Sequence, residues 1–306
     1  MQNIVILSGG FSEEAEVSKV TSKEIASALN EKGKKITIID PADFDSYIIM
    51  LDQIKKIKPD LVFIGLHGAE GENGSIQSLL KLEKIPFTGS GERSSAIAMD
   101  KYISGILAQY LGIKLPKRRL LYKNYEYDFE SFFENLSLPL VVKPNDSGSS
   151  VGISIIKEKN ELSSALDKAF IYSKQVLLEE FIDGRELTVT ILGNKALPVV
   201  EIIPHNGWYD YDNKYTKGNT IYEVPAKLSD ELTELIQKQA CDVFELFGCE
   251  VYARVDFRLE GEVLYFLEVN TLPGMTKLSL TPMAAEEAGF SFKELIYKII
   301  ELSIKR

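Results

Sequence analysis

The sequence predicts an α/β protein in which an N-terminal parallel-sheet domain precedes a region of mixed α+β architecture. Two observations support this fold class. Over the first 90 residues, short apolar segments alternate with segments of helical spacing, which is typical of parallel βαβ units. From about residue 185, strand-like segments dominate, and at least two of them are joined by a tight turn.

The first region is expected to hold three strands with helices between and after them. The strands are the apolar runs at residues 3–8, 35–40 and 60–66, and the helices cover residues 16–32, 44–57 and 75–83. Ligands bind beyond the carboxyl ends of the strands in such sheets. The loops at that end are rich in glycine and in small or charged residues, namely "SGGFSEEAEVS", "LHGAEGENGS" and "FTGSGERS".

The second region starts near residue 93 with two helices, which extend to about residue 111. A strand "KRRLLY", a helix near 128–135 and the segment "LPLVVKPNDSGSSVGISII" follow. This last segment reads as a hairpin whose glycine- and serine-rich loop forms a flexible flap. A helix over 160–173 and the strand "QVLLEEFI" complete the region.

The third region contains four predicted strands, "ELTVTIL", "ALPVVEII", "CEVYARVDFRL" and "EVLYFLEVN". Between Ile203 and Leu228 we expect a long loop that includes "HNGWYDYDNKYTKGNT" and shows neither helical nor strand periodicity. Loops of this length in compact domains are usually functional lids or disordered. Ser291 and Glu294 predict a capping box at the start of the final helix. We therefore expect domains at residues 1–92, 93–183 and 184–306.

Composition excludes several classes of protein. The chain has 306 residues and a formal net charge of −10, which argues against a general binder of nucleic acid or anionic membranes. Its two cysteines, Cys241 and Cys249, form no C-x-x-C pair, so neither a zinc ribbon nor a disulfide framework is expected. No apolar run approaches the ~18 residues of a membrane helix, and we expect a soluble cytoplasmic protein.

The flap segment points to phosphate binding. G-x-x-x-x-G-K-[ST] is absent, and "GSGERS" lacks the third glycine of the dinucleotide motif. Lys143 ends an apolar strand, and the small residues 148–152 that follow offer free backbone N–H groups to an anion. The alternative is an ordinary flexible hairpin with a lysine that extends into solvent.

Two neighbouring strands of the third region predict a metal site. Arg254 and Asp256 share one strand face, and so do Glu268 and Asn270. The short turn at 260–262 places Asp256 and Glu268 on adjacent strands within reach of each other. Two carboxylates and an amide oxygen are ligands suited to Mg²⁺, whereas a solvated sheet edge would scatter its polar residues.

Several motifs resemble one family in order along nearly the whole chain. The segments "VVKPNDSGSSVG", "LLEEFIDGRELTV", "YARVDFRL" and "LEVNTLPGMTKLSLTPMAAEEAG" resemble the ATP-grasp fold. Together with "GGFSEEAEVS", "LHGAEGENG", "FTGSG" and "MDK" they resemble the D-alanine–D-alanine ligase family. The resemblance implies a two-subdomain ATP-grasp fold after the first domain.

The resemblance also implies the chemistry. ATP would phosphorylate the carboxylate of one D-alanine, the amine of a second would attack the acyl phosphate, and the dipeptide would serve peptidoglycan synthesis. The nucleotide-binding residues it implies are Lys101, Lys143, Ser150, Val151, Glu179, Phe181, Ile182, Glu186 and Lys214. Asp256, Glu268 and Asn270 would bind two Mg²⁺ ions, with Mn²⁺ as an alternative.

The resemblance assigns the amino-acid half of the site as well. Glu14 would anchor the ammonium of the first D-alanine and form a hydrogen-bonded trio with Ser149 and Tyr215. Tyr215 would favour D-alanine over D-lactate as the second substrate. Arg254 and the Gly274 N–H would stabilise the oxyanion. The remaining substrate contacts implied are those of His67, Ser279 and Leu280.

Three positions depart from the family pattern, namely Ala15, Asn73 and Ser147. None of them removes a proposed catalytic group. A homodimer is expected because dimers are common in the family. Two alternatives stay open: an ATP-grasp ligase for a different acid and amine, and a non-catalytic nucleotide-binding protein, which would not need Arg254, Asp256, Glu268 and Asn270 together.

Overall fold

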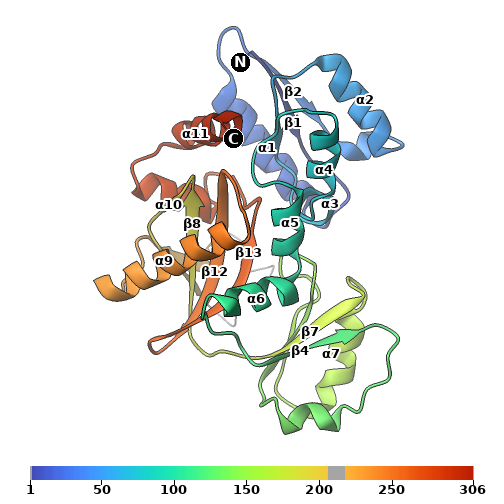
Figure 1. The fold of residues 1–306 in the computed structure, drawn as a ribbon, viewed down its shortest axis with the longest axis vertical. Coiled ribbons are helices and arrows are strands. Elements are labelled where there is room, and N and C mark those ends of the chain that lie inside the picture. Colours follow the sequence, from blue (N-terminus) through green and yellow to red (C-terminus); the bar gives the residue numbers. More distant parts are fainter. Residues whose placement is uncertain (1, 206–217, 306) are drawn as a thin grey trace.

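A computed structural model describes residues 2–205 and 218–305. The molecule is elongated, and three sheets follow one another along its long axis (Figure 1). A three-stranded sheet lies at one end, a six-stranded sheet in the middle and a four-stranded sheet at the other end. The predicted combination of a parallel N-terminal sheet with mixed α+β regions is confirmed.

The N-terminal sheet is parallel throughout and has the strand order β2-β1-β3. Its strands are β1 (Asn3–Leu7), β2 (Lys35–Ile39) and β3 (Leu61–Ile64), and its helices are α1 (Ala15–Leu29), η1 (Pro41–Asp43), α2 (Tyr47–Ile57), α3 (Ala69–Glu72) and α4 (Ser75–Leu82). The short helix α3 was not predicted, because glycine interrupts any apolar period in "LHGAEGENGS".

The four-stranded sheet has the order β4-β7-β5-β6 and is antiparallel at every pairing. It consists of β4 (Arg118–Tyr122), β5 (Leu140–Pro144), β6 (Ser154–Ile156) and β7 (Gln175–Glu180), with η2 (Glu130–Glu134), η3 (Lys159–Glu161) and α7 (Leu162–Ala169). The β5–β6 hairpin confirms the predicted strand, loop and strand of the flap segment.

Two helices predicted for this region are shorter in the structure. Residues 130–134 form a 3₁₀-helix, because Asp128 accepts a hydrogen bond from the Glu130 N–H and local side-chain bonds favour a tight turn. The helix expected at 160–173 covers only Leu162–Ala169. It is preceded by a 3₁₀ turn in which the Glu161 carboxylate accepts hydrogen bonds from two backbone N–H groups.

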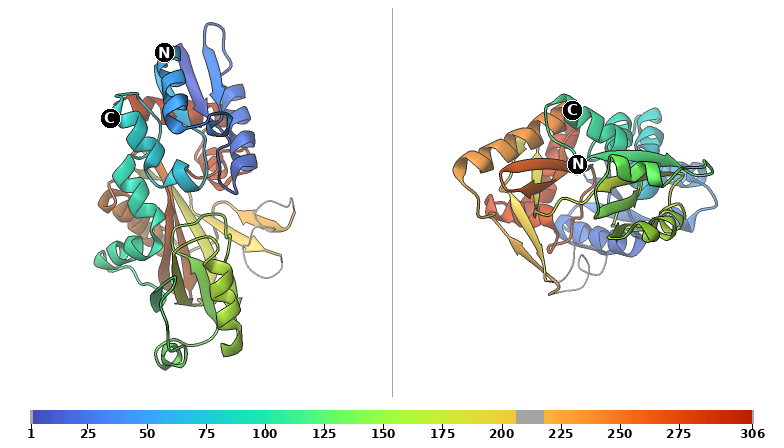
Figure 2. Two further views of the ribbon diagram at one scale, coloured as in Figure 1. Left: turned by 90° about the vertical axis from the view of Figure 1, so that its right-hand side faces the viewer. Right: turned by 90° about the horizontal axis from the view of Figure 1, so that it is seen from below.

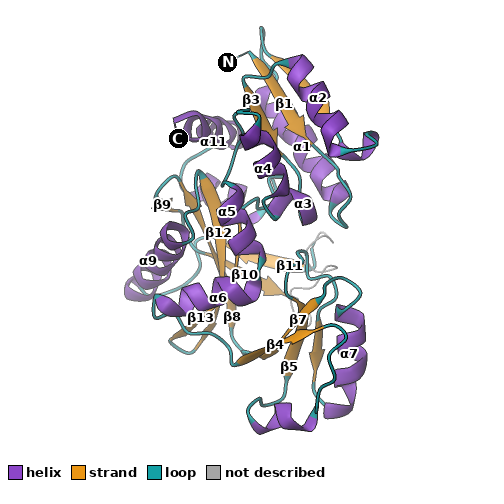
Figure 3. Ribbon diagram, turned by 45° about the vertical axis from the view of Figure 1, so that its right-hand side comes forward, coloured by secondary structure: helices purple, strands orange, loops and turns teal. Residues whose placement is uncertain are grey.

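The six-stranded sheet has the order β11-β10-β8-β12-β13, with β9 paired to β8. Its strands are β8 (Arg185–Leu192), β9 (Lys195–Ala196), β10 (Val200–Pro204), β11 (Thr220–Glu223), β12 (Tyr252–Glu260) and β13 (Val263–Asn270). Helices α5 (Glu92–Met99), α6 (Lys101–Tyr110) and α9 (Asp230–Leu246) cover one face of it (Figure 3). The opposite face carries the polar side chains described below.

Two elements of the third region differ from expectation. Thr220–Glu223, placed in the long loop by sequence, forms the edge strand β11 and pairs antiparallel with β10. Its side chains are at most half-buried, so the strand leaves no apolar pattern. The 17-residue helix α9 lies between strands in a region expected to be mostly strand.

The hydrophobic core joins the two ends of the chain. Helices α10 (Leu280–Glu287) and α11 (Phe292–Lys305) pack in the same core cluster as β1, β2 and β3. Helix α11 contacts α1 of the N-terminal region, and the left view of Figure 2 shows the red C-terminal helices close to the blue N-terminal region. The domain boundaries stay a prediction, and this cluster crosses from residues 1–92 into residues 184–306.

Within residues 2–205 and 218–305, no helix is both long and apolar enough to cross a membrane.

Candidate functional site

Strand β12 separates a packed core from a polar face. Ala253, Val255 and Phe257 are buried in the cluster that α6 and α9 complete. The residues between them, Arg254 and Asp256, line pockets on the opposite face. Because successive side chains of a strand point to opposite faces, the alternation in "YARVDFRL" places one charged row on the open side of the sheet.

The hairpin register brings the predicted metal ligands together. Asp256 pairs with Glu268, and Arg254 pairs with Asn270. The register shifts between Asp256 and Phe257, and such a bulge re-aims side chains next to many functional sites. The predicted proximity of Asp256 and Glu268 on adjacent strands is confirmed.

Each of the two carboxylates contacts a cation of the protein. Arg254 donates from Nε and Nη2 to the two Asp256 oxygens, at 2.9 Å each, and Thr188 Oγ1 donates to Asp256 Oδ1 at 2.5 Å. Lys101 Nζ lies 3.1 Å from Glu268 Oε2. These contacts offset the repulsion between the two carboxylates.

The amide of Asn270 supplies an observation in favour of a cation. Its Oδ1 is buried and accepts no hydrogen bond in the described part of the chain, and an unsatisfied buried acceptor is costly. A metal beside Asp256, Glu268 and Asn270 would satisfy it, since Mg²⁺ prefers oxygen ligands. Within residues 2–205 and 218–305 no group of three His, Cys, Asp or Glu residues could hold a metal, so any site here depends on the amide.

The flap loop is anchored to the start of α6. The buried Asn145 side chain donates to Asp100, and the Tyr102 N–H donates to its amide oxygen. Lys101 Nζ donates to the carbonyl oxygen of Ser147 at 2.8 Å. Ser149 and Ser150 have left-handed backbone angles, with φ of 52° and 57°. Non-glycine residues adopt these at a cost of about 1–2 kcal/mol each, often at ligand-binding loops.

Two pockets meet at the polar face of the six-stranded sheet. The larger has a volume of about 470 Å³ and the smaller about 130 Å³. Lys101, Arg254 and Glu268 line both of them. The junction of the two pockets therefore holds two cations and a carboxylate, beside Asp256.

The smaller pocket combines apolar walls with charged ends. Phe181, Ile182, Val141 and Ile155 line it together with Lys143 and Glu179, and an apolar slot of this kind suits a flat ring. Lys143 Nζ lies 2.7 Å from Glu179 Oε2. At another side of the pocket, Arg258 Nη2 lies 2.9 Å from Glu186 Oε2.

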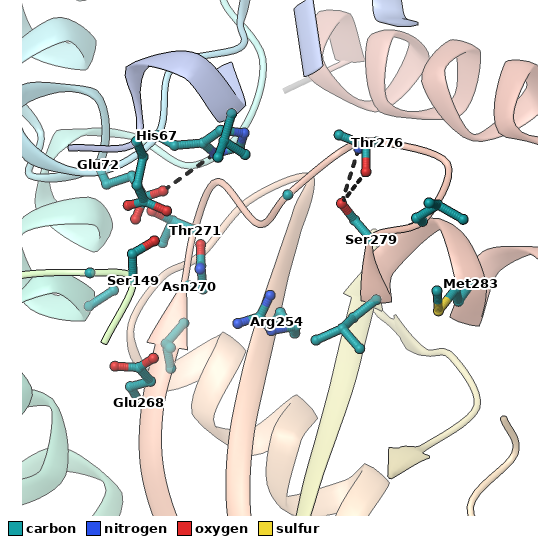
Figure 4. Close-up of a pocket in the computed structure, with 18 of the residues that line it drawn as sticks. His67, Glu72, Ser149, Arg254, Glu268, Asn270, Thr271, Thr276, Ser279 and Met283 are labelled. Atoms are coloured by element: carbon teal, nitrogen blue, oxygen red, sulfur yellow. Dashed lines mark hydrogen bonds and ion pairs between the residues drawn. The ribbon is translucent and has the colours of Figure 1, made fainter. Parts of the chain in front are cut away.

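The larger pocket is lined from both ends of the chain (Figure 4). Glu14 and His67 come from the N-terminal region, and Gly274, Ser279 and Leu280 come from the loop after β13 and the start of α10. The Ser279 hydroxyl accepts a hydrogen bond from the Thr276 N–H at 3.1 Å. A Cβ on Gly274 would lie 2.9 Å from Ser279 Oγ, so only glycine fits this turn without displacing Ser279.

His67 is buried against a second buried acid. Its Nδ1 donates to the Leu272 carbonyl at 3.1 Å and lies 3.8 Å from Glu72 Oε1. Burial lowers the pKa of His67, but Glu72, Glu14 and the Leu272 carbonyl outweigh it and raise the pKa above its usual value. Burial also raises the pKa of Glu72. Both groups therefore retain protons more strongly in the folded protein.

The structure brings together most of the residues singled out in the sequence. The larger pocket is lined by Glu14, His67, Lys101, Ser149, Arg254, Glu268, Asn270, Gly274, Ser279 and Leu280. The smaller one adds Lys143, Ser150, Glu179, Phe181, Ile182, Glu186 and Asp256. Val151 belongs to the lining of neither pocket, and Lys214 and Tyr215 lie outside the described residues.

Sequence reasoning missed two charged residues of the site, Glu72 and Arg258. Glu72 lines the larger pocket and Arg258 the smaller. Arg258 follows Asp256 by two residues, so the alternation of "YARVDFRL" contained the signal. Of the three departures noted above, Asn73 accepts a hydrogen bond from the Ser75 N–H at the start of α4, and the Ser147 backbone contacts Lys101.

Comparison with known proteins gives consistent similarities over the chain. Residues 107–301 match the family model described as D-ala D-ala ligase C-terminus, and residues 40–90 match the one described as D-ala D-ala ligase N-terminus. A curated D-alanine–D-alanine ligase of Halalkalibacterium halodurans is 41% identical over 99% of this chain and 99% of its own length.

Two solved structures extend the similarity to the fold. The D-alanine–D-alanine ligase of Bacillus anthracis complexed with ATP has a TM-score of 0.86 and 34% identity, over 100% of this chain and 98% of its own. The VanG D-Ala:D-Ser ligase of Enterococcus faecalis has a TM-score of 0.84 and 30% identity, over 99% of each chain.

Proposed function

The chain belongs to the D-alanine–D-alanine ligase family, and on that premise we propose that it joins two D-alanine molecules with ATP. The products are D-alanyl-D-alanine, ADP and phosphate, and the dipeptide serves the synthesis of peptidoglycan precursors. The observation that carries the proposal is the meeting of two pockets at Lys101, Arg254 and Glu268. One pocket suits a nucleotide and the other suits two small amino acids, so phosphoryl transfer takes place where they join.

The smaller pocket is the proposed site of the nucleotide. Its apolar walls, with Phe181 and Ile182, take the base, and Glu179 faces it from the same side. Glu186 accepts from the ribose hydroxyls. Lys101 and Lys143 bind the phosphates, and the flap residues Ser150 and Val151 lie over them. The Bacillus anthracis relative was solved in complex with ATP, which supports ATP as the nucleotide.

Asp256, Glu268 and Asn270 are the proposed ligands of two Mg²⁺ ions. The buried acceptor of Asn270 and the facing carboxylates fit such ions. When bound, Mg²⁺ neutralises the charge that develops on the transferred phosphoryl group. Arg254 and Lys101, which contact the two carboxylates, keep the ligand oxygens oriented toward the junction.

The larger pocket is the proposed site of both D-alanine molecules. The Glu14 carboxylate binds the ammonium of the first, and His67 helps to orient it. Ser279 and Leu280, at the start of α10, bind the carboxylate of the second. Its amine then attacks the acyl phosphate formed on the first.

Arg254 and the Gly274 N–H form the proposed oxyanion site, since both line the larger pocket. They donate to the oxygen that becomes negative in the tetrahedral intermediate, before phosphate leaves. Ser149 contributes to closing the site in the proposed trio with Glu14 and Tyr215. Closure would keep water from the acyl phosphate. Lys214 and Tyr215 lie outside the described residues, and their roles stay as predicted from the resemblance.

The first experiment measures phosphate release with ATP, Mg²⁺ and D-alanine, together with analysis of the dipeptide product. L-Alanine, D-lactate and D-serine serve as parallel second substrates. Release that requires D-alanine and yields D-alanyl-D-alanine is expected. Release with another amino acid but not with D-alanine would instead identify a ligase for a different acid and amine.

A homodimer is the proposed assembly. Helix α6 exposes apolar side chains at Ile103, Ile106 and Tyr110, which share one helix face and offer a surface for a second copy. Light scattering after size-exclusion chromatography tests whether the protein is a dimer.

A cytoplasmic location is also proposed, on the basis that neither Cys241 nor Cys249 forms a disulfide.

A further inference from the structure

Arg118 is a buried cation next to the proposed nucleotide site, but it does not belong to the lining of either pocket. It is the first residue of β4, and only 8% of its side chain is exposed. A buried guanidinium is expensive unless its donors are satisfied. Its partners therefore indicate what it does.

On one side, Arg118 holds the start of helix α6. Its Nη1 donates to the Lys101 carbonyl at 3.2 Å, and its Nη2 donates to the Tyr102 carbonyl at 3.1 Å. Its guanidinium carbon also lies 5.3 Å from the centre of the Tyr102 ring. The planar fork thus fixes the helical turn that carries the Lys101 side chain to the pocket junction.

Helix α6 provides space for this guanidinium with a glycine. A Cβ at Gly105 would lie 2.0 Å from Arg118 Nη2 and 2.4 Å from its Cζ. Both are far shorter than any van der Waals contact. Gly105 is less favourable than alanine inside a helix, so its presence is explained by the room that it leaves for Arg118.

On its other side, the Arg118 guanidinium lies near the ion pair between Glu179 and Lys143, the second lysine proposed to bind phosphate. Arg118 and Glu179 are register partners on β4 and β7, and Nη1 lies 3.8 Å from Glu179 Oε1. The other oxygen of that carboxylate lies 2.7 Å from Lys143 Nζ. Glu179 is therefore shared between two cations, which weakens its hold on Lys143.

We propose that Arg118 is a positioning residue that fixes Lys101 and Lys143 relative to each other for binding the phosphates of ATP. The proposal rests on the proposed function, which makes these two lysines phosphate ligands. Arg118 acts through two contacts: it orients the turn of α6 that carries Lys101, and it shares the negative charge of Glu179 so that Lys143 remains available to an incoming phosphate.

The test combines two substitutions that disturb Arg118 from different sides. Arg118→Lys keeps the charge but loses the planar fork. Gly105→Ala leaves Arg118 in the sequence and displaces its guanidinium with a methyl group, in a helix that favours alanine. Arg119→Lys is the matched control, because Arg119 is the exposed next residue of β4 and stacks on Phe132, 4.4 Å from the ring centre.

We expect Arg118→Lys and Gly105→Ala each to raise the KM for ATP, and the Kd for ADP measured by calorimetry, about tenfold, equivalent to about 1.4 kcal/mol. The KM for D-alanine should change less than about twofold, since its proposed contacts lie in the larger pocket. Arg119→Lys should match the wild type in all three. Circular dichroism verifies that each variant is folded. If Arg118→Lys does not fold, Gly105→Ala alone tests the proposed role of Arg118.

Folded variants with unchanged KM for ATP and Kd for ADP would overturn the proposal. So would an equal rise in the KM for ATP and the KM for D-alanine, which indicates general loosening of the fold. Failure of the proposed function looks different: the wild type itself would then bind no ADP or release no phosphate.

Discussion

Glu268 stands where the two pockets join, and its carboxylate contacts Lys101. We predict that Glu268→Gln lowers kcat about 100-fold or more, because an amide of the same size lacks the charge that a Mg²⁺ ligand needs. The fold should persist, since the side chain is about one-third exposed. Phosphate release over a series of Mg²⁺ concentrations measures the effect.

Glu262→Gln is the matched control for this substitution. Glu262 lies in the exposed turn between β12 and β13 of the same hairpin, so its replacement should leave kcat and the Mg²⁺ dependence unchanged. Full activity of Glu268→Gln would show that Glu268 is not a required metal ligand.

The buried pair of His67 and Glu72 predicts a pH dependence of stability. Both folded-state pKa values are raised above the ordinary 6.5 and 4.5. The folded state therefore holds more protons than the unfolded state. The stabilisation is fully present below the unfolded pKa of each group and is lost as the pH rises through its folded pKa.

We expect that the free energy of unfolding of the double variant His67→Gln/Glu72→Gln does not fall in this way as the pH rises. Urea unfolding from about pH 5 to about pH 9 should show the free energy of unfolding of the wild type falling relative to that of the variant. His205→Gln, a change at the exposed histidine, serves as the control. A difference between wild type and double variant that stays constant with pH would contradict the assignment.

At the scale of a single element, the start of α11 shows a reciprocal cap. Ser291 N–H donates to Glu294 Oε2 at 2.8 Å, and the Glu294 N–H donates back to Ser291 Oγ at 3.3 Å. We predict that Ser291→Ala lowers the free energy of unfolding by about 1 kcal/mol, because the Glu294 N–H loses its acceptor and the Glu294 carboxylate loses the hydrogen bond from the Ser291 hydroxyl. The kcat should not change.

Urea unfolding of Ser291→Ala, Glu294→Ala and the double variant measures the coupling between the two residues. The two single effects should not add, because each side chain acts through the same cap. Strict additivity would show that the two hydrogen bonds contribute independently.

Several elements were predicted from a local signal in the sequence, whereas β11 and α9 were not predicted. The capping box and the β5–β6 and β12–β13 hairpins follow from short motifs, and the structure contains all three. No residue of strand β11 is fully buried, so its four residues carry little apolar signal, and its pairing with β10 reveals it. Helix α9 had local signals that were not used: Ser229 caps it, and Ile236, Ala240 and Val243 repeat along its buried side.

The residues of the site were predicted from sequence motifs. The contacts that buried side chains make between distant segments were not predicted. The short turn between β12 and β13 places Asp256 and Glu268 on adjacent strands, which the sequence predicted. Counting from that turn alone would pair Asp256 with Leu267, and the register shift between Asp256 and Phe257 makes Glu268 its partner. The contact of Arg118 with α6 and Glu179 joins segments 16 and 61 residues away along the chain. Sequence spacing alone does not determine such contacts.

At the scale of the whole molecule, the core that α11 shares with the N-terminal sheet predicts long-range destabilisation. Ile299 is fully buried in that cluster, with Leu7 and Ile25 among its members. Ile299→Ala should lower the free energy of unfolding by about 2–5 kcal/mol, through lost burial and the cavity left behind.

Hydrogen exchange tests where the effect of Ile299→Ala appears. Amides of β1 and β3 should exchange faster, although they lie far from Ile299 in sequence. Ile304→Ala is the control, because Ile304 is exposed on the same helix. Faster exchange confined to α11 would show that the N-terminal sheet is stable without it.

The shared core also has a consequence for synthesis of the protein on the ribosome. Residues 4–87 of the cluster emerge early, but their partners Leu295 to Ile300 emerge last. At a translation rate of about 5–20 residues per second, the N-terminal strands wait roughly 10–40 s for those partners. During that interval the nascent chain presents apolar surface that native packing later covers, so chaperones that bind nascent chains have their best opportunity there.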